Sequence, residues 1–189
     1  MSTPAHRASD DQPDARCVLA AREGDVEAFA VLARWWAPRL LSFCRSQVRG
    51  EDEDIVQDVL LAAWSRLPDL DDPHRFRAWL YAIARNRCRE VLRTRGRRAT
   101  DPSGPEAFTD RPDEGLGPES THLGGEAMEA LRSVLAAMPG ELSRVWWFAE
   151  TDQMSYAEIA RVESVPVSTV RGRLARARTS VAAGMEEWR

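Results

Sequence analysis

Hydrophobic residues recur every three or four positions through several segments of the chain, which is the spacing of an α-helix that buries one face. The first segment follows Asp25, a residue suited to cap a helix start. Its apolar positions are Phe29, Leu32, Trp36, Leu40, Leu41 and Cys44. A second segment, from about Asp52 to Leu67, begins with acidic residues that complement the helix dipole. Its inward positions are Ile55, Val56, Val59, Leu60, Ala63 and Trp64, and its outward positions are Asp54, Gln57, Asp58 and Leu61.

A third amphipathic helix is predicted after the polar turn of residues 68–75 and extends to about Arg98. Its apolar seam consists of Phe76, Trp79, Leu80, Ile83, Ala84, Cys88, Val91 and Leu92. The residues predicted to face away from this seam are Arg77, Arg85, Asn86, Arg89 and Arg93. Three of these arginines, Arg85, Arg89 and Arg93, follow one another at four-residue intervals and repel each other. A polyanion along this face would relieve the repulsion.

The C-terminal part predicts a helix from about Glu126 to Met138 and another that starts at Pro139, a residue suited to the first helical turn. Their apolar positions are Leu131, Val134, Leu135, Leu142, Val145, Trp146 and Phe148. These two helices are expected to support the segment that follows them.

Residues 155–178 have the pattern of two helices joined by a short turn. Ser155 and Glu158 form a capping box at the first helix, and Pro166 marks the turn. Ser168 and Thr169 are expected to supply side-chain oxygens at the start of the second helix. That helix is expected to bury Val170, Leu174, Ala177 and Val181 and to spread Arg171, Arg173, Arg176 and Arg178 over its remaining surface. Arginine clamps phosphates and reads guanine edges, so the pattern favours a helix-turn-helix on duplex DNA over a solvated basic helix in a bundle.

Charge is strongly segregated along the chain, although the net charge is only −4. Residues 85–98 contain seven arginines and one acid, whereas residues 101–129 contain eight acids and one arginine. The second stretch is also rich in proline and glycine, which predicts an extended or disordered connector. We therefore expect a disordered N-terminus over 1–13, a helical domain over 14–98, a connector over 99–125 and a second helical domain over 126–189. The fold class is all-α, and the asymmetry is typical of a nucleic-acid binder.

Several other classes of protein are disfavoured. No apolar run is long enough to span a bilayer and the N-terminus lacks a signal-peptide core, so we expect a cytoplasmic protein without direct membrane insertion. Three cysteines and three histidines are scattered without a C-x-x-C pair, so no metal site, cofactor or disulfide is predicted. An enzyme is not expected either, because there is no phosphate loop and no evident nucleophile with its base.

Three motifs resemble the extracytoplasmic-function (ECF) sigma factors of the sigma-70 family. The run SYAEIA followed by VPVSTVRGRLARAR is similar to their region 4, DEDIVQDVLLAAW to region 2.2, and FRAWLYAIARN to regions 2.3 and 2.4. The resemblance implies an alternative sigma factor that binds bacterial RNA polymerase core, recognises the −35 and −10 promoter elements and helps to open promoter DNA. It also implies an anti-sigma factor as a probable partner and an acidic connector that threads toward the RNA path of the polymerase.

The resemblance assigns roles to the polar positions singled out above. By this resemblance, the residues that contact core polymerase are Asp54, Gln57, Asp58 and Leu61. Without the resemblance, their spacing indicates only the solvent-exposed face of a helix. The −10 element contacts are Asp71, Asp72, His74 and Arg75 in the loop that would hold a flipped base, with Arg77, Arg85, Asn86, Arg89 and Arg93 beyond it. The −35 contacts are Ser168, Thr169, Arg171, Arg173 and Arg176, with Arg171 and Arg173 as candidates for base edges.

Two departures from the family pattern and one alternative remain open at this point. Glu163 and Ser164 stand where the family usually has a leucine-like residue and a glycine, which predicts a strained turn or looser packing. Trp146 and Trp147 replace the usual aliphatic residues. The alternative function is a stand-alone helix-turn-helix regulator that binds DNA without polymerase, and substitution of Asp54 and Gln57 distinguishes the two.

Overall fold

In the described part of the chain, every regular element is helical. The computed structural model describes residue 13 and residues 15–48, 52–100 and 122–188, and these contain eight α-helices and three short 3-10 helices. The expectation of an all-α fold is therefore confirmed. Most of the predicted connector and N-terminal segment lie outside the described residues.

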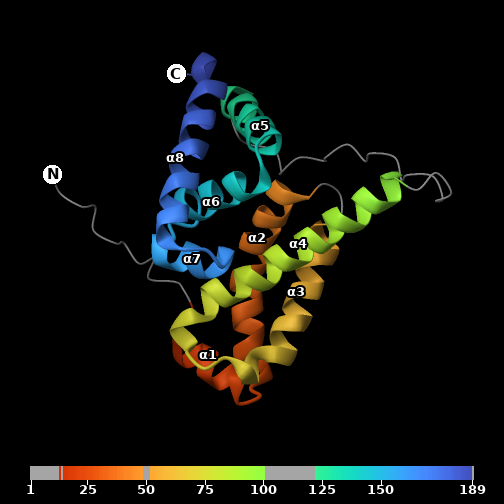
Figure 1. Cartoon of the computed structure of the whole chain (residues 1–189). Coiled ribbons are helices and arrows are strands. Elements are labelled where there is room, and N and C mark those ends of the chain that lie inside the picture. Colours follow the sequence, from red (N-terminus) through yellow and green to blue (C-terminus); the bar gives the residue numbers. More distant parts are fainter. Residues whose placement is uncertain (1–12, 14, 49–51, 101–121, 189) are drawn as a thin grey trace.

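The N-terminal half forms the lower part of the molecule in Figure 1. It consists of α1 (Ala15–Arg22), α2 (Val26–Gln47), α3 (Asp52–Arg66), two 3-10 turns, η1 (Leu67–Asp69) and η2 (Pro73–Arg75), and α4 (Phe76–Thr100). The helix α1 was not predicted. Asp25 caps α2 as expected, because its carboxylate accepts a hydrogen bond from the Ala28 amide at 3.0 Å.

The C-terminal half contains α5 (His122–Ala137), α6 (Gly140–Glu150), α7 (Tyr156–Glu163), α8 (Val167–Gly184) and η3 (Glu186–Trp188). The predicted capping box is present at the start of α7, where Ser155 and Glu158 bond reciprocally. The cap of α8 differs from the prediction. Its N-cap is Pro166 with no side-chain hydrogen bond, so Ser168 and Thr169 lie inside the first turn and do not cap the helix. Pro139 is likewise the N-cap of α6 and not its first residue.

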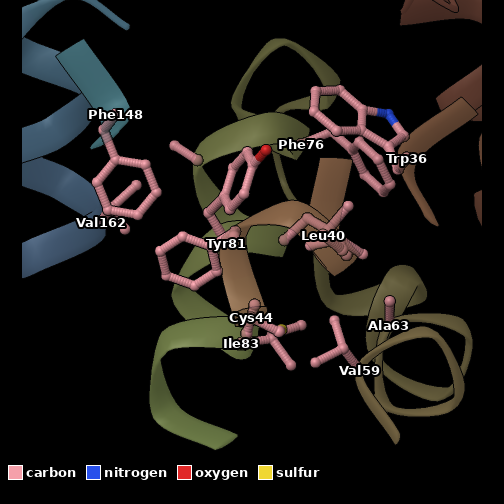
Figure 2. Close-up of a cluster of buried hydrophobic side chains, with 14 of the residues drawn as sticks. Trp36, Leu40, Cys44, Val59, Ala63, Phe76, Tyr81, Ile83, Phe148 and Val162 are labelled. Carbon is pink, nitrogen blue, oxygen red and sulfur yellow. The ribbon is translucent and has the colours of Figure 1, made fainter. Parts of the chain in front are cut away.

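The core of the N-terminal half is made by the apolar seams of α2, α3 and α4, as Figure 2 shows. Leu40, Val59 and Ala63 are fully buried, and Phe76 lies edge-on to Trp36 with ring centroids 6.2 Å apart. Phe76 is thus a core residue and not an exposed stacking platform. Three predicted seam positions lie nearer the surface: Leu92 is exposed, and Trp79 and Val91 are half-buried.

The two halves pack against each other and share one core. Phe148 of α6 stacks on Phe43 of α2 with ring centroids 5.1 Å apart and lies edge-on to Tyr81 of α4 at 5.3 Å. In Figure 1 the short helix α7 lies directly against α4, and in Figure 2 Phe148 and Val162 point into the cluster around Tyr81. The first helix of the helix-turn-helix, α7, therefore packs on α4, the helix that carries Arg85, Arg89 and Arg93 at four-residue intervals.

Candidate nucleic-acid and protein interfaces

The outward face of α3 is a mixed acidic and apolar surface. Asp54, Gln57, Asp58 and Leu61 are all exposed, as their spacing predicted, and Leu61 remains 61% exposed despite its apolar side chain. Beside it lies a shallow groove of about 500 Å³ between α2 and α3, whose floor is almost wholly apolar. Its lining residues are Val26, Phe29, Glu53, Val56, Gln57, Leu60, Leu61 and Trp64. An exposed apolar patch with charges at its rim is typical of a protein–protein interface.

The helix α8 presents only some of its arginines to solvent. Val170, Leu174 and Ala177 are buried, and Arg171 and Arg176 are exposed together with the small residues between them. Ser168 is exposed and Thr169 is half-buried at the start of the helix. Arg178 is engaged at the other end, because its guanidinium bonds to the Glu150 carboxylate at 2.7 Å. The exposed surface is suited to contact the phosphates and base edges of a DNA groove.

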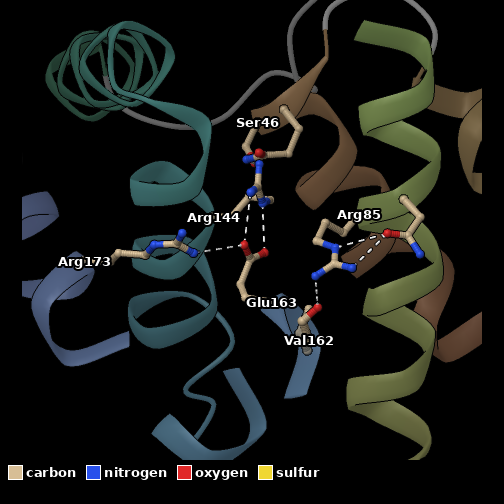
Figure 3. A network of polar contacts seen from close by, with 8 residues as sticks. Ser46, Arg85, Arg144, Val162, Glu163 and Arg173 are labelled. Carbon is tan, nitrogen blue, oxygen red and sulfur yellow. Dashed lines mark hydrogen bonds and ion pairs between the residues drawn. The ribbon is translucent and has the colours of Figure 1, made fainter. Parts of the chain in front are cut away.

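Arg173 does not share that surface, because a buried carboxylate holds it. Glu163, at the end of α7, is buried and accepts two hydrogen bonds from Arg144 of α6, at 2.9 and 3.0 Å. The guanidinium of Arg173 lies 3.7 Å from the same carboxylate (Figure 3). Arg173 therefore lies on the flank of α8, where it balances a buried charge, whereas Arg171 and Arg176 are exposed.

Of the two outcomes predicted for the turn between α7 and α8, the structure shows a strained backbone and not looser packing. Ser164 adopts a left-handed backbone with φ of 56°, the conformation for which glycine is favoured, and it ends α7. Glu163 in turn is clamped by Arg144 and is well packed. The turn thus stores some backbone strain, and the ion pair replaces the apolar packing that a leucine would provide.

The loop before α4 keeps most of its polar residues accessible. Asp71, His74 and Arg75 are exposed, whereas Asp72 is half-buried and accepts a hydrogen bond from the His74 amide at 3.0 Å. Asp72 therefore shapes the loop as the N-cap of η2. The loop lies at the same end of α4 as the region that contacts α7.

The arginine face of α4 is divided in two. Asn86, Arg89 and Arg93 are exposed, as predicted. Arg85 was predicted to face away from the apolar seam together with these residues, but α7 covers it, so it is not available on the surface. It is only 7% exposed, its guanidinium donates to the Val162 carbonyl of α7, and burial lowers its pKa. Arg77 is also engaged, because it donates to the Glu158 carboxylate at 3.1 Å and to the Asp152 carbonyl at 3.4 Å.

Sequence reasoning missed the residues that make these contacts from the other half of the chain. Glu158 was recognised only as a capping residue, although it is also the partner of Arg77. Burial opposes the ionisation of Glu158, but hydrogen bonds from Arg77 and Ser155 outweigh that effect and lower its pKa. For Asp152, burial dominates and raises the pKa. The sequence contained one indication of a buried ion pair, which is that the charged residue Glu163 lies between the apolar residues Val162 and Val165.

Among the described residues, no group of three or more His, Cys, Asp or Glu side chains is placed to hold a metal ion. Cys44 and Cys88 are buried free thiols whose sulfur atoms lie 3.8 Å apart, and the hydrogen bond between them, together with burial, raises the pKa of Cys44. Within the described ranges, no helix is both long and apolar enough to cross a membrane.

These features define a class of protein. The chain combines a helix-turn-helix that has exposed arginines with a second helical domain that has its own arginine face and a separate exposed apolar groove. This combination is typical of a DNA-binding transcription protein. The comparisons with known proteins agree with this class. The family model described as sigma-70 region 2 matches residues 32–98, and the model for sigma-70 region 4 matches residues 128–181. The chain belongs to the sigma-70 family of RNA polymerase sigma factors, and its likeness is to the ECF type.

Individual relatives extend over nearly the whole chain. The ECF RNA polymerase sigma-E factor of Escherichia coli strain K12 is 29% identical over 180 residues, which are 92% of this chain and 94% of the relative. The RNA polymerase sigma-H factor of Pseudomonas aeruginosa is 29% identical over 178 residues, 90% of this chain and 92% of the relative. The solved structure of CnrH in complex with the cytosolic domain of CnrY is 26% identical, has a TM-score of 0.69, and covers 93% of this chain and 98% of its own.

Proposed function

We propose that this chain is an alternative sigma factor whose exposed α3 face binds RNA polymerase core while α4 and α8 bind the −10 and −35 promoter elements. The proposal rests on two observations taken together. The chain contains a sigma-70 region 2 followed by a region 4, the order found in the family. Arginines are exposed on α8, and acidic and apolar side chains are exposed on α3. The protein would act in the cytoplasm, where polymerase and chromosome are, as a recognition subunit without an enzymatic step of its own.

The polymerase contact is assigned to Asp54, Gln57, Asp58 and Leu61. Their support is that all four are exposed on one face of a rigid helix, with carboxylates for steering and an apolar side chain for burial. Leu61 would account for much of the apolar contact, because an exposed leucine gains free energy when a partner covers it.

The promoter contacts divide according to the form of the DNA. For the duplex −35 element we assign Arg171 and Arg176 to base edges or phosphates and Ser168 and Thr169 to the backbone near the start of α8. For the melted −10 element we assign the exposed loop residues Asp71, His74 and Arg75, with Asp72 shaping the loop. Behind the loop we assign the exposed amide of Asn86 and the cations Arg89 and Arg93. Arg77 and Arg85 belong to the same predicted set, and in this structure they bond to Glu158 and Val162 of α7.

An anti-sigma factor is the expected regulator. The support is the solved complex of the sigma factor RpoE with the anti-sigma factor NepR from Bartonella quintana, in which the sigma factor shares the fold of this chain with a TM-score of 0.68 at 22% identity.

Run-off transcription with purified core polymerase tests the proposal. The wild-type chain should direct transcripts from a promoter of the same genome, and Asp54→Ala/Gln57→Ala and Arg171→Ala/Arg176→Ala should each abolish them. The first variant should fail to bind core, whereas the second should bind core normally. DNA binding without core association or initiation would refute the proposal and favour the stand-alone helix-turn-helix regulator.

A further inference from the structure

The carboxylate of Glu163 holds an arginine of α8, the second helix of the helix-turn-helix. Glu163 ends α7, shortly before Pro166, the N-cap of α8. Its side chain is 3% exposed and accepts two hydrogen bonds from Arg144 of α6, at 2.9 and 3.0 Å. The guanidinium of Arg173 on α8 lies 3.7 Å from the same carboxylate, as Figure 3 shows. One buried carboxylate therefore serves guanidinium groups from two different helices.

Arg173 starts close to the exposed face of α8 but ends away from it. Residues three and four positions apart are neighbours on a helix, so Arg173 lies between Thr169 and the exposed Arg176 on one side of α8. An arginine at such a position extends readily to the phosphates that line a DNA groove. The Arg173 side chain is only 21% exposed, because its guanidinium is directed to Glu163. The ion pair therefore decides where the charge of Arg173 lies.

The electrostatics favour this inward position of the guanidinium. Among the described residues, Glu163 is the only carboxylate within 4.0 Å of Arg173. Its oxygens are fixed by the hydrogen bonds from Arg144, so the attraction needs no rearrangement of the carboxylate. A partly buried ion pair is also screened by salt less than an exposed cation and a phosphate are. Arginine binds carboxylates and phosphates with the same fork of donors, so a guanidinium held by Glu163 is not available to DNA.

We propose that Glu163 is a positioning residue for DNA binding, which holds Arg173 off the phosphate backbone and leaves Arg171 and Arg176 to meet the duplex. The inference deepens the proposed function and rests on it, because it takes α8 as the helix that binds the −35 element. A phosphate contact carries no sequence information and strengthens binding to any duplex. By removing one such contact, the carboxylate lowers the binding of the protein to the many competing non-promoter sites of a chromosome.

The salt dependence of duplex binding reports the number of phosphate contacts. Each contact changes the slope of log affinity against log salt by about 0.9. Binding of the full-length proteins to a fluorescein-labelled promoter duplex of the same genome, and to an unrelated duplex of equal length, is measured by anisotropy. The first variant is Arg173→Ala, which keeps both hydrogen bonds between Arg144 and Glu163 and is expected to fold. It should show the slope of the wild type on both duplexes.

The double variant Arg144→Leu/Glu163→Leu releases Arg173 without changing the net charge of the chain, because it removes one guanidinium and one carboxylate. Its slope should become steeper by about 0.9, so that its loss of affinity between 50 and 200 mM salt is about threefold to fourfold greater than that of the wild type. Addition of Arg173→Ala should return the slope to the wild-type value. The matched control is Glu150→Leu/Arg178→Leu, which removes an exposed ion pair from the same half of the chain and should leave the slope unchanged.

Two results would overturn the proposal. In the first, Arg173→Ala reduces the slope by about 0.9, because Arg173 then contacts a phosphate in the wild type. In the second, Arg144→Leu/Glu163→Leu shows the same slope as Glu150→Leu/Arg178→Leu. Circular dichroism checks that each variant is folded, and Arg173→Ala decides the question by itself if the double variant does not fold.

Failure of the proposed function would give a different result. A wild-type protein that does not prefer the promoter duplex would refute the assignment of α8 to the −35 element. The slopes on the unrelated duplex would still decide whether Glu163 holds Arg173 away from phosphates.

Discussion

The buried carboxylate of Glu163 offers a quantitative test of the packing inside the helix-turn-helix. Its side chain is 3% exposed, and it neutralises Arg144, which is 12% exposed, and Arg173, which is 21% exposed. In Glu163→Gln, the amide oxygen accepts only part of the two hydrogen bonds from Arg144, and the amide NH₂ group faces a guanidinium donor. The substitution therefore leaves two cations close together without their counter-charge.

The loss of unfolding free energy in Glu163→Gln can be estimated from how deeply the ion pair is buried. Removal of one partner from a fully buried ion pair costs about 3–5 kcal/mol. Because both guanidinium groups retain some contact with water, we expect Glu163→Gln to lower the free energy of unfolding by about 2–3 kcal/mol. With a urea slope of about 1–3 kcal/mol per molar, the unfolding midpoint should fall by about 1 M.

The control is an ion pair of the same chemistry at the surface. Glu150 bonds to Arg178 at 2.7 Å, but their side chains are 36% and 55% exposed, so Glu150→Gln should cost no more than about 1 kcal/mol. Urea unfolding of both variants, followed by circular dichroism, measures the difference. If Glu163→Gln destabilises the protein no more than Glu150→Gln does, the burial argument is refuted. As a second check, Arg144→Leu/Glu163→Leu should recover much of the loss, since an apolar pair needs no desolvation of charge.

Four further predictions concern other parts of the structure. Phe148→Ala should lower the free energy of unfolding by about 3–5 kcal/mol in urea titrations, because it leaves a cavity between two aromatic rings; a loss below about 1 kcal/mol would contradict the shared core. The folded-state pKa of Asp152 is raised above 3.8, so its ionisation costs stability as pH rises through that pKa. Asp152→Asn should therefore raise Tm at pH 7 and change it little near pH 3.5, and a lower Tm at pH 7 would refute this sign. Ser155→Ala should cost about 1 kcal/mol in thermal unfolding through loss of the α7 cap, and an unchanged Tm would argue against the cap. Arg176→Ala should weaken −35 duplex binding and reduce the slope of log affinity against log salt by about 1 if Arg176 contacts a phosphate, whereas an unchanged affinity would remove it from the interface.

The sequence by itself determined the features that depend only on residues of the same helix or the same turn. The cap at Asp25, the capping box of Ser155 and Glu158, and the exposure of Asp54 and Leu61 all depend on residues a few positions apart. Helical periodicity and backbone capping are local effects, so a single sequence suffices to predict them. The motifs also identified both regions of the sigma-70 family in the correct order.

Only the tertiary structure decided which arginines are free. Arg85 and Val162 are 77 residues apart in the chain, and Arg144 and Glu163 are brought together from different helices. Periodicity shows which face of α4 avoids its own domain, but it does not show that a second domain covers part of that face. Arg77 and Arg85 are therefore occupied while Arg89 and Arg93 on the same helix remain exposed, because the partner groups that satisfy a charge come from segments distant in sequence.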